Sequence, residues 1–334
     1  MQSMNVLRWK RGMAIVSAIS VCILLVILYR TVTAGEGNIF DQRSENPFAA
    51  IGSQDAVHIS GNIGIKPVKG SVINVECDAQ FVTTDGSLYI PPTTTLDAMS
   101  YEQLKCLYHS FVSNIGFHCK RVVRLGNLKD GGWEVCHDLK YRPKKNCLVY
   151  SAGIAFDFSF DDQIAAKYGC EVHSFDPSMN KPDFQRSKLV FFHNIGLANF
   201  NTGPKNELKN KWNMRTAWTI KNLLGHTKRH IDVLKLDIET WEWKVLPELI
   251  KSQFLDDVTT LDLELHMTSN PSPKVWIYEL GRDAYLHALK TLFDLQELGF
   301  RIFWTHRNLA CYFKSKEGIE RTSCQEISMV KVKQ

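Results

Sequence analysis

The sequence predicts an α/β domain, with a mostly parallel β-sheet that is covered by helices on both faces. After Lys145, short runs of apolar, β-branched and aromatic residues alternate with amphipathic segments. This alternation is typical of parallel strands joined by helical crossovers. The expected strands are residues 147–154, 171–175, 189–195, 231–238, 259–265 and 300–305, with later strands at 310–313 and 328–332.

Helical periodicity is clear in two segments between these strands, residues 241–252 and 282–298. A third helical repeat begins soon after Leu96 and is formed by Tyr101, Leu104, Tyr108, Phe111 and Ile115. The pattern changes at Leu96, so we expect the folded domain to cover residues 96–334.

The N-terminal segment contains an uncharged apolar run over residues 13–29, preceded by Arg8, Lys10 and Arg11. Such a run fits a membrane-spanning helix or the hydrophobic part of a signal peptide. The basic flank is expected to stay cytoplasmic, which leaves the remainder of the chain in the lumen.

We therefore expect a cytoplasmic tail at residues 1–12, a signal anchor at 13–30 and a luminal stem at 31–95. The chain would then be a single-pass type II membrane protein of the endoplasmic reticulum or Golgi. The small residues Val32-Thr33-Ala34 leave cleavage open, and a cleaved chain would be secreted.

Cysteine content and net charge indicate the cellular compartment and exclude some classes of partner. Nine cysteines are present, and the eight beyond Cys22 make an even number that suits luminal disulfides, although spacing leaves their pairing open. There is no CxxC pair, so the sequence predicts no metal site. The net charge of +5 comes without a dense Lys/Arg run, which argues against a nucleic-acid partner.

Candidate ligand residues lie where the expected strands end, because ligands of open α/β sheets bind across the carboxyl ends of the strands. The first strand ends in Ser151-Ala152-Gly153, and Asp157 follows; Gly153 would let the backbone pass close to a ligand. The second strand ends at Asp176, twenty-three residues after Gly153. A carboxylate at that distance can accept hydrogen bonds from both hydroxyls of a ribose.

The next strands add further polar groups. The third ends near Asn194 and Gly196, which could hold an adenine edge. The fourth ends in Asp237 and Glu239, which are two apart and so point to the same side. The fifth ends at His266, a candidate general base.

Four segments are distinctive when they are taken together, namely Asp130-Gly131-Gly132-Trp133-Glu134-Val135-Cys136, Cys147-Leu148-Val149-Tyr150-Ser151-Ala152-Gly153-Ile154, Asp157-Phe158-Ser159-Phe160-Asp161 and His173-Ser174-Phe175-Asp176-Pro177-Ser178. They resemble the class I S-adenosylmethionine-dependent methyltransferases, in particular the methyltransferase-like protein 24 family. The resemblance extends over about residues 96–313. Residues 231–239 also resemble the fourth strand of FkbM-type O-methyltransferases, in which an acidic pair follows a lysine.

The resemblance implies a Rossmann-like, seven-stranded sheet whose last strands form an antiparallel hairpin. It implies S-adenosyl-L-methionine as cofactor, with Gly153 near its methionine part and Asp176 on its ribose. It also implies a disulfide between Cys136 and Cys147. The acid that usually leads the glycine loop is replaced by Ser151, and Asp157 or Asp161 would substitute for it.

The resulting hypothesis is O-methyl transfer to a small-molecule or glycan acceptor in the lumen, with Asp237, Glu239 or His266 as base or acceptor ligand. Two alternatives stay open. A type II membrane glycosyltransferase would use Asp161-Asp162 or the Asp237/Glu239 pair to hold a divalent metal. A catalytically inactive binding module on the same fold would explain the altered glycine loop.

Overall fold

The computed structural model describes residues 81–82, 86–203, 212–267, 280–315 and 317–332. The expected tail, the anchor at 13–30 and residues 31–80 of the expected stem lie outside this part of the chain. Within the described part, no helix combines the length and apolar character needed to cross a membrane.

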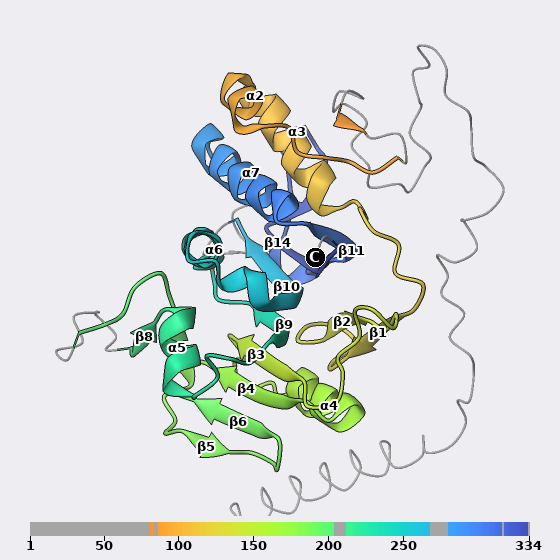
Figure 1. The fold of residues 1–334 in the computed structure, drawn as a ribbon. Coiled ribbons are helices and arrows are strands. Elements are labelled where there is room, and N and C mark those ends of the chain that lie inside the picture. The colour runs from red at the N-terminus through yellow and green to blue at the C-terminus, as the bar shows by residue number, and fades with distance from the viewer. Residues whose placement is uncertain (1–80, 83–85, 204–211, 268–279, 316, 333–334) are drawn as a thin grey trace, which may run out of the picture. The chain divides into compact units, whose positions relative to one another are not determined.

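The main sheet confirms the α/β prediction and orders its strands β11-β14-β10-β9-β3-β4-β6-β5 (Figure 1). Neighbouring strands from β10 to β6 are parallel, whereas β14 runs antiparallel to both β10 and β11. The sheet has eight strands rather than seven, because the chain turns back before β6 and adds the two-residue strand β5 at the edge. The bounds are β3 Leu148–Ala152, β4 Glu171–Phe175, β5 Phe184–Gln185, β6 Val190–His193, β9 Ile231–Leu236, β10 Val258–His266, β11 Phe300–Arg307 and β14 Cys324–Lys331.

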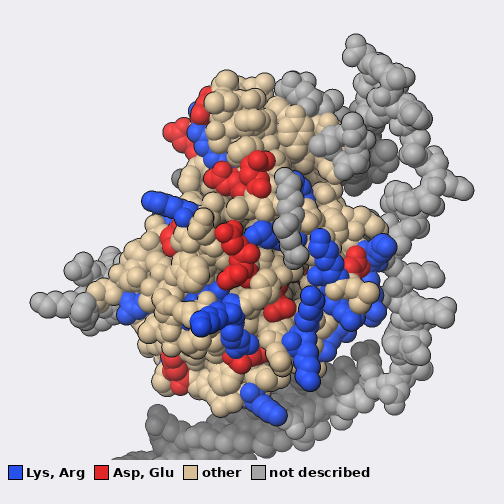
Figure 2. Space-filling model, viewed as in Figure 1, with Lys and Arg blue, Asp and Glu red and all other residues tan. Residues whose placement is uncertain are grey.

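Charged side chains of both signs share the face seen in Figure 1. Acidic side chains gather in its middle, and Lys and Arg side chains lie on both sides of them (Figure 2). Charge on this face therefore does not by itself indicate one class of partner.

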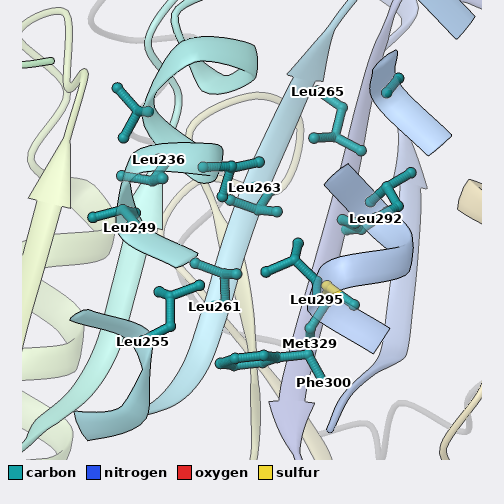
Figure 3. Packing of buried hydrophobic residues seen from close by; sticks show 14 of the residues in the cluster. Leu236, Leu249, Leu255, Leu261, Leu263, Leu265, Leu292, Leu295, Phe300 and Met329 are labelled. Atoms are coloured by element: carbon teal, nitrogen blue, oxygen red, sulfur yellow. The ribbon is translucent and has the colours of Figure 1, made fainter. Parts of the chain in front are cut away.

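Helices and a hairpin cover the two faces of the sheet. Alternate residues of each strand point to opposite faces, so Val149 and Val233 pack under helix α4 while Tyr150 and Leu234 belong to the core on the other side. That second core, shown in Figure 3, is closed mainly by α3, α6 and α7. The helices are α2 Thr93–Ala98, α3 Tyr101–Val112, α4 Ser159–Tyr168, α5 Ala217–Leu223, α6 Glu242–Lys251 and α7 Arg282–Glu297.

The packed region includes residues before Leu96. Phe81 and Ile90 are buried in the same core as α7. The Gln296 side chain fixes this segment, since its Oε1 accepts from the Ile90 N–H at 2.9 Å and its Nε2 donates to the Ile90 carbonyl at 3.1 Å. Ile90 is therefore held to α7 by both polar groups of its backbone.

Several elements differ from the sequence-based expectation. The hairpin of β1 (Val122–Leu125) and β2 (Trp133–Cys136) is additional and lies on the α4 side of the sheet. The strand expected at residues 310–313 is a 3₁₀ turn, Leu309–Cys311, followed by β12 (Tyr312–Lys314). This strand pairs with β13 (Glu320–Thr322) outside the main sheet. A further small parallel pair joins β7 (Gly196–Leu197) to β8 (Met214–Arg215).

Three disulfides join Cys119 to Cys136, Cys147 to Cys170, and Cys311 to Cys324. Cys106 is disulfide-bonded as well. The expected Cys136–Cys147 bond is wrong. Parallel strands β3 and β4 pair Leu148 with Glu171, which places the preceding cysteines of the two strands side by side, with Cα atoms 4.5 Å apart.

Candidate functional site

A cavity of ≈ 950 Å³ lies at the carboxyl ends of β3, β4, β9 and β10. Parallel strands end at one edge, so residues far apart in sequence meet there. Asn194 does not line the cavity; its N–H donates instead to Asp183 Oδ1 at 2.8 Å. The other candidate residues all line it, namely Ser151, Gly153, Asp157, Asp176, Gly196, Asp237, Glu239 and His266.

Gly153 is required by the packing of two strand ends. Its φ of +76° lies in the left-handed region, and its N–H donates to the Phe175 carbonyl at 2.8 Å. A Cβ atom at this position would overlap the carbonyl oxygen of Asp237. Glycine is therefore required because the backbone here passes close to the end of β9, in addition to any close approach to a ligand.

Asp176 holds the loop that follows β3. Its Oδ2 accepts from the N–H groups of Ile154 and Ala155, at 3.1 and 2.8 Å. Its Oδ1 accepts from the N–H and the hydroxyl of Ser178, at 2.8 and 2.6 Å. Four donors fill the usual acceptor capacity of a carboxylate, so a ribose hydroxyl would have to replace one of them.

The two acids considered as substitutes for the missing loop acid have different surroundings. Asp157 is half-buried and accepts from Asn127 Nδ2 at 2.6 Å and from the Ser159 N–H at 2.8 Å, which ties the β1–β2 loop to the start of α4. Asp161 is buried and accepts from the Ser174 hydroxyl at 2.6 Å. Burial raises the pKa of Asp161, although the Ser174 hydrogen bond and the Lys235 charge oppose the rise.

Lys235 is a site residue that the sequence interpretation passed over. Its buried Nζ donates to the carbonyls of Ala152 and Gly153 and lies 3.2 Å from Asp237 Oδ2. The signal was present, since a lysine inside an apolar strand is rare unless it is paired. Its ammonium ties the ends of β3 and β9 together.

Trp133, on β2, is the second residue that was missed as a ligand contact. It lines the cavity and is only 2% exposed. Among the described residues, no acceptor lies within hydrogen-bond distance of its Nε1. A buried donor without an acceptor is costly, so this N–H is well suited to a ligand.

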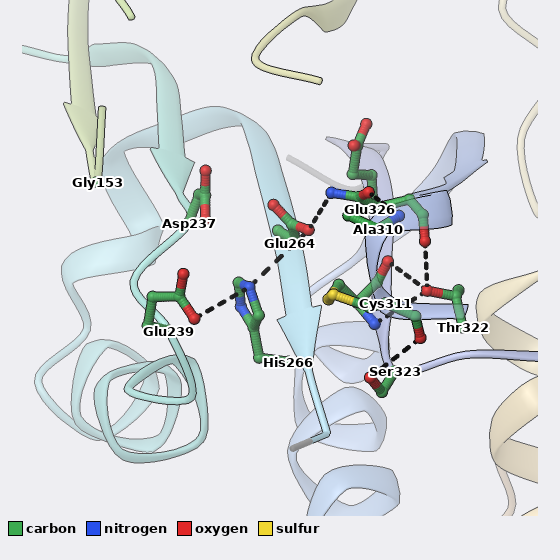
Figure 4. Close-up of polar contacts among 12 residues, drawn as sticks. Gly153, Asp237, Glu239, Glu264, His266, Ala310, Cys311, Thr322, Ser323 and Glu326 are labelled. Carbon is green, nitrogen blue, oxygen red and sulfur yellow. Dashed lines mark hydrogen bonds and ion pairs between the residues drawn. A yellow bond between two sulfur atoms is a disulfide. The ribbon is translucent and has the colours of Figure 1, made fainter. Parts of the chain in front are cut away.

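The opposite end of the cavity centres on His266 (Figure 4). Its Nδ1 lies 3.1 Å from Glu242 Oε1, and Glu242 is fully buried. Its Nε2 lies 3.7 Å from Glu239 Oε2 and 3.8 Å from Glu264 Oε1. Burial alone lowers the pKa of His266, but the hydrogen bond to Glu242 and the surrounding carboxylates outweigh burial and raise the pKa to about 9. This histidine is therefore an imidazolium near pH 7 and lacks the free base that the sequence suggested.

Glu264 is the carboxyl group whose protonation is most relevant at this end. Burial, followed by the charge of Asp237, raises its pKa to about 8. Asn308 Nδ2 donates to its Oε1 at 2.9 Å, and Glu326 lies directly across from it on β14. Glu264 alternates with Asp262 and His266 along β10, and all three side chains are buried, so the local sequence does not distinguish Glu264 from the other two.

Two loops at the cavity edge hold strained backbone. Ala155 and Phe156 after β3, and Glu239 and Thr240 after β9, all have positive φ. Each such non-glycine residue costs about 1–3 kcal/mol and persists only where its surroundings impose it. These strained residues therefore lie in two of the loops that form the edge of the cavity.

Comparisons with known proteins agree with this geometry. A family model described as a methyltransferase domain matches residues 98–314. Two relatives called "Probable methyltransferase-like protein 24" are 31% identical (Homo sapiens) and 32% identical (Rattus norvegicus) over 206 residues. These alignments cover 59% of this chain and 55% of each relative, so the chain matches about half the length of those proteins. No solved structure matches. The chain therefore belongs to the methyltransferase domain family.

Proposed function

We propose that the chain is an S-adenosylmethionine-dependent O-methyltransferase. The observation that carries the proposal is the shape of the single cavity described above. One end is formed by the loops after β3 and β4, and the other by the acids and His266 of β9 and β10. A donor and an acceptor hydroxyl bound at these two ends would meet inside one enclosure, which supplies the positioning that methyl transfer chiefly needs.

The donor end has groups that fit S-adenosylmethionine. Trp133 Nε1 offers a buried N–H to an acceptor atom such as a carboxylate oxygen. Asp161 and Asp157 supply carboxylates beside the loop whose leading acid is replaced by Ser151. When bound, the cofactor supplies a methyl group made electrophilic by its sulfonium.

At the acceptor end, we assign His266 as a hydrogen-bond donor and Glu264 as the group that accepts a proton. The distances from His266 Nε2 to Glu239 and Glu264 exceed a hydrogen bond, so its N–H can donate to an acceptor hydroxyl. The pKa of about 8 keeps Glu264 mostly protonated near pH 7, and it is the ionised fraction of Glu264 that can take the hydroxyl proton as the new C–O bond forms and the C–S bond breaks. Asp237 and Glu239 then serve to bind the acceptor.

A luminal site of action is part of the proposal. The three disulfides and the bonded Cys106 support an oxidising compartment. Residues 13–30 would anchor the chain there, with a small-molecule or glycan acceptor. Protease protection of the full chain in sealed microsomes tests this orientation: digestion of the domain without detergent would contradict it.

Donor binding tests the proposed function directly. Calorimetry of the full chain with S-adenosylmethionine should give one site, and Trp133→Phe should weaken binding about tenfold because one buried hydrogen bond is lost. Trp218→Phe is the matched control, since Trp218 Nε1 bonds to the Ser252 carbonyl outside the cavity. Absence of binding by the wild type, or equal weakening by both variants, would contradict the cofactor assignment.

The ionisation of His266 is a separate prediction. In an NMR titration, its ring should titrate with a pKa of about 9, because Glu242 stabilises the imidazolium. Glu242→Gln removes the largest of the effects that raise this pKa, so the pKa should fall, with burial then opposed only by the charges of Glu264 and Asp237. His287, an exposed histidine, is the internal reference. A normal pKa for His266 in the wild type would exclude its role as a permanent donor.

A further inference from the structure

A second cluster of titratable side chains lies on the other face of the sheet. Glu171 and His173 come from β4, and His226 follows α5. Strand side chains alternate, so His173 points away from the face on which its neighbour Ser174 reaches Asp161. None of the three lines the large cavity, and both histidines are buried.

The cluster converges on one point. The Nε2 atoms of His173 and His226 lie 3.0 and 3.2 Å from the same oxygen, Glu171 Oε1. Each of the three residues offers a ligand atom that lies within 4.8 Å of the ligand atoms of the other two. Zinc bonds of about 2.0–2.2 Å in a tetrahedron place neighbouring ligand atoms roughly 3.3 Å apart. The spacing is therefore close to what one zinc ion requires.

The other ring nitrogen of each histidine is already engaged. His226 Nδ1 lies 2.9 Å from Tyr150 Oη, and His173 Nδ1 lies 2.8 Å from His193 Nε2. His193 Nδ1 in turn lies 3.1 Å from Asp183 Oδ2. Neutral rings with their protons on Nδ1 satisfy all three contacts. Both Nε2 lone pairs then face the Glu171 carboxylate, an arrangement of three acceptor atoms that requires a cation between them. Metal-binding histidines are oriented in this way by outer partners.

A cation already occupies this position in the structure. Arg229 Nη1 lies 2.7 Å from Glu171 Oε1 and 3.3 Å from His226 Nε2. Its side chain is 32% exposed, so it can turn toward solvent when another cation takes its place. The Glu171 carboxylate and the His226 ring therefore already hold a positively charged group between them.

We propose that Glu171, His173 and His226 form a zinc site that ties β4 to the chain after α5, with water as fourth ligand. Zinc would displace the Arg229 guanidinium. The inference is independent of methyl transfer, because none of these residues contacts the proposed donor or acceptor.

The test uses the full chain, stripped with a chelator and then titrated with zinc. One zinc per chain should remain after dialysis, and cobalt in its place should show the visible absorption of a tetrahedral site. His173→Gln and His226→Gln should abolish this binding. His118→Gln, at an exposed position, should retain it. Absence of stoichiometric zinc in the wild type, or zinc retained by both ligand variants, overturns the proposal.

Two variants that keep all ligands guard against a folding defect. Arg229→Met removes the competing cation and should raise zinc affinity. Tyr150→Phe removes the partner of His226 and should lower the affinity about tenfold, as outer-partner losses commonly do. Unchanged affinity in both would show that the metal binds elsewhere.

Discussion

Gly153→Ala is expected to destabilise the domain by roughly 2–5 kcal/mol and to abolish donor binding. The added Cβ would overlap the Asp237 carbonyl, and alanine is strained at a φ of +76°. Because Lys235 ties the same two strand ends together, the end of β9 cannot move without breaking those contacts. Urea denaturation and calorimetry with S-adenosylmethionine measure the two effects.

Gly203→Ala is the matched control for this prediction. Among the residues that the structure describes, no atom other than those of its chain neighbours lies within 4 Å of a Cβ built there, and Gly203 is not among the glycines with positive φ. Its stability should stay within about 0.5 kcal/mol of the wild type. If the two variants were equally stable, the ends of β3 and β9 would have to be more loosely packed than described.

Asp176→Ala is expected to cost roughly 3–5 kcal/mol, because several hydrogen-bond donors lose a charged acceptor at once. The N–H groups of Ile154 and Ala155 and both donors of Ser178 depend on this carboxylate. Loss of donor binding should accompany the loss of stability, since the same loop forms one end of the cavity. Asp283→Ala, at a fully exposed side chain, should leave stability unchanged.

The outcome for Asp176 separates two roles. A stable Asp176→Ala protein that loses only donor affinity would mean that the carboxylate serves mainly the ribose. A large loss of stability would mean that it chiefly holds the loop. Trp133→Phe remains the cleaner test of the donor site, because Trp133 Nε1 has no partner among the described residues that could be lost.

The local pattern of the sequence was enough for the sheet and for the positions of most strand ends. Residues 171–175 form β4 with the predicted bounds, β9 begins at the predicted residue and ends two residues early, and β10 is longer than predicted by one residue at each end. These segments are apolar runs, and such runs can be recognised from residues that are neighbours in the sequence. Since parallel strands share an edge, eight of nine candidate residues line one cavity.

What the sequence left undetermined depends on residues that meet across the fold. The expected Cys136–Cys147 bond failed because strand register pairs Cys147 with Cys170. The protonation of His266 depends on Glu242, a residue of another element that is invisible in any local pattern. Glu171 and His173 likewise gain the third ligand of the proposed zinc site only when the fold brings His226 beside β4. Hydrophobic periodicity by itself determined the parallel strands of the main sheet and the helices α3, α6 and α7. The pairing of cysteines, the charge of His266 and the zinc cluster were decided by tertiary structure, because burial and distance between remote residues exist only in the folded chain.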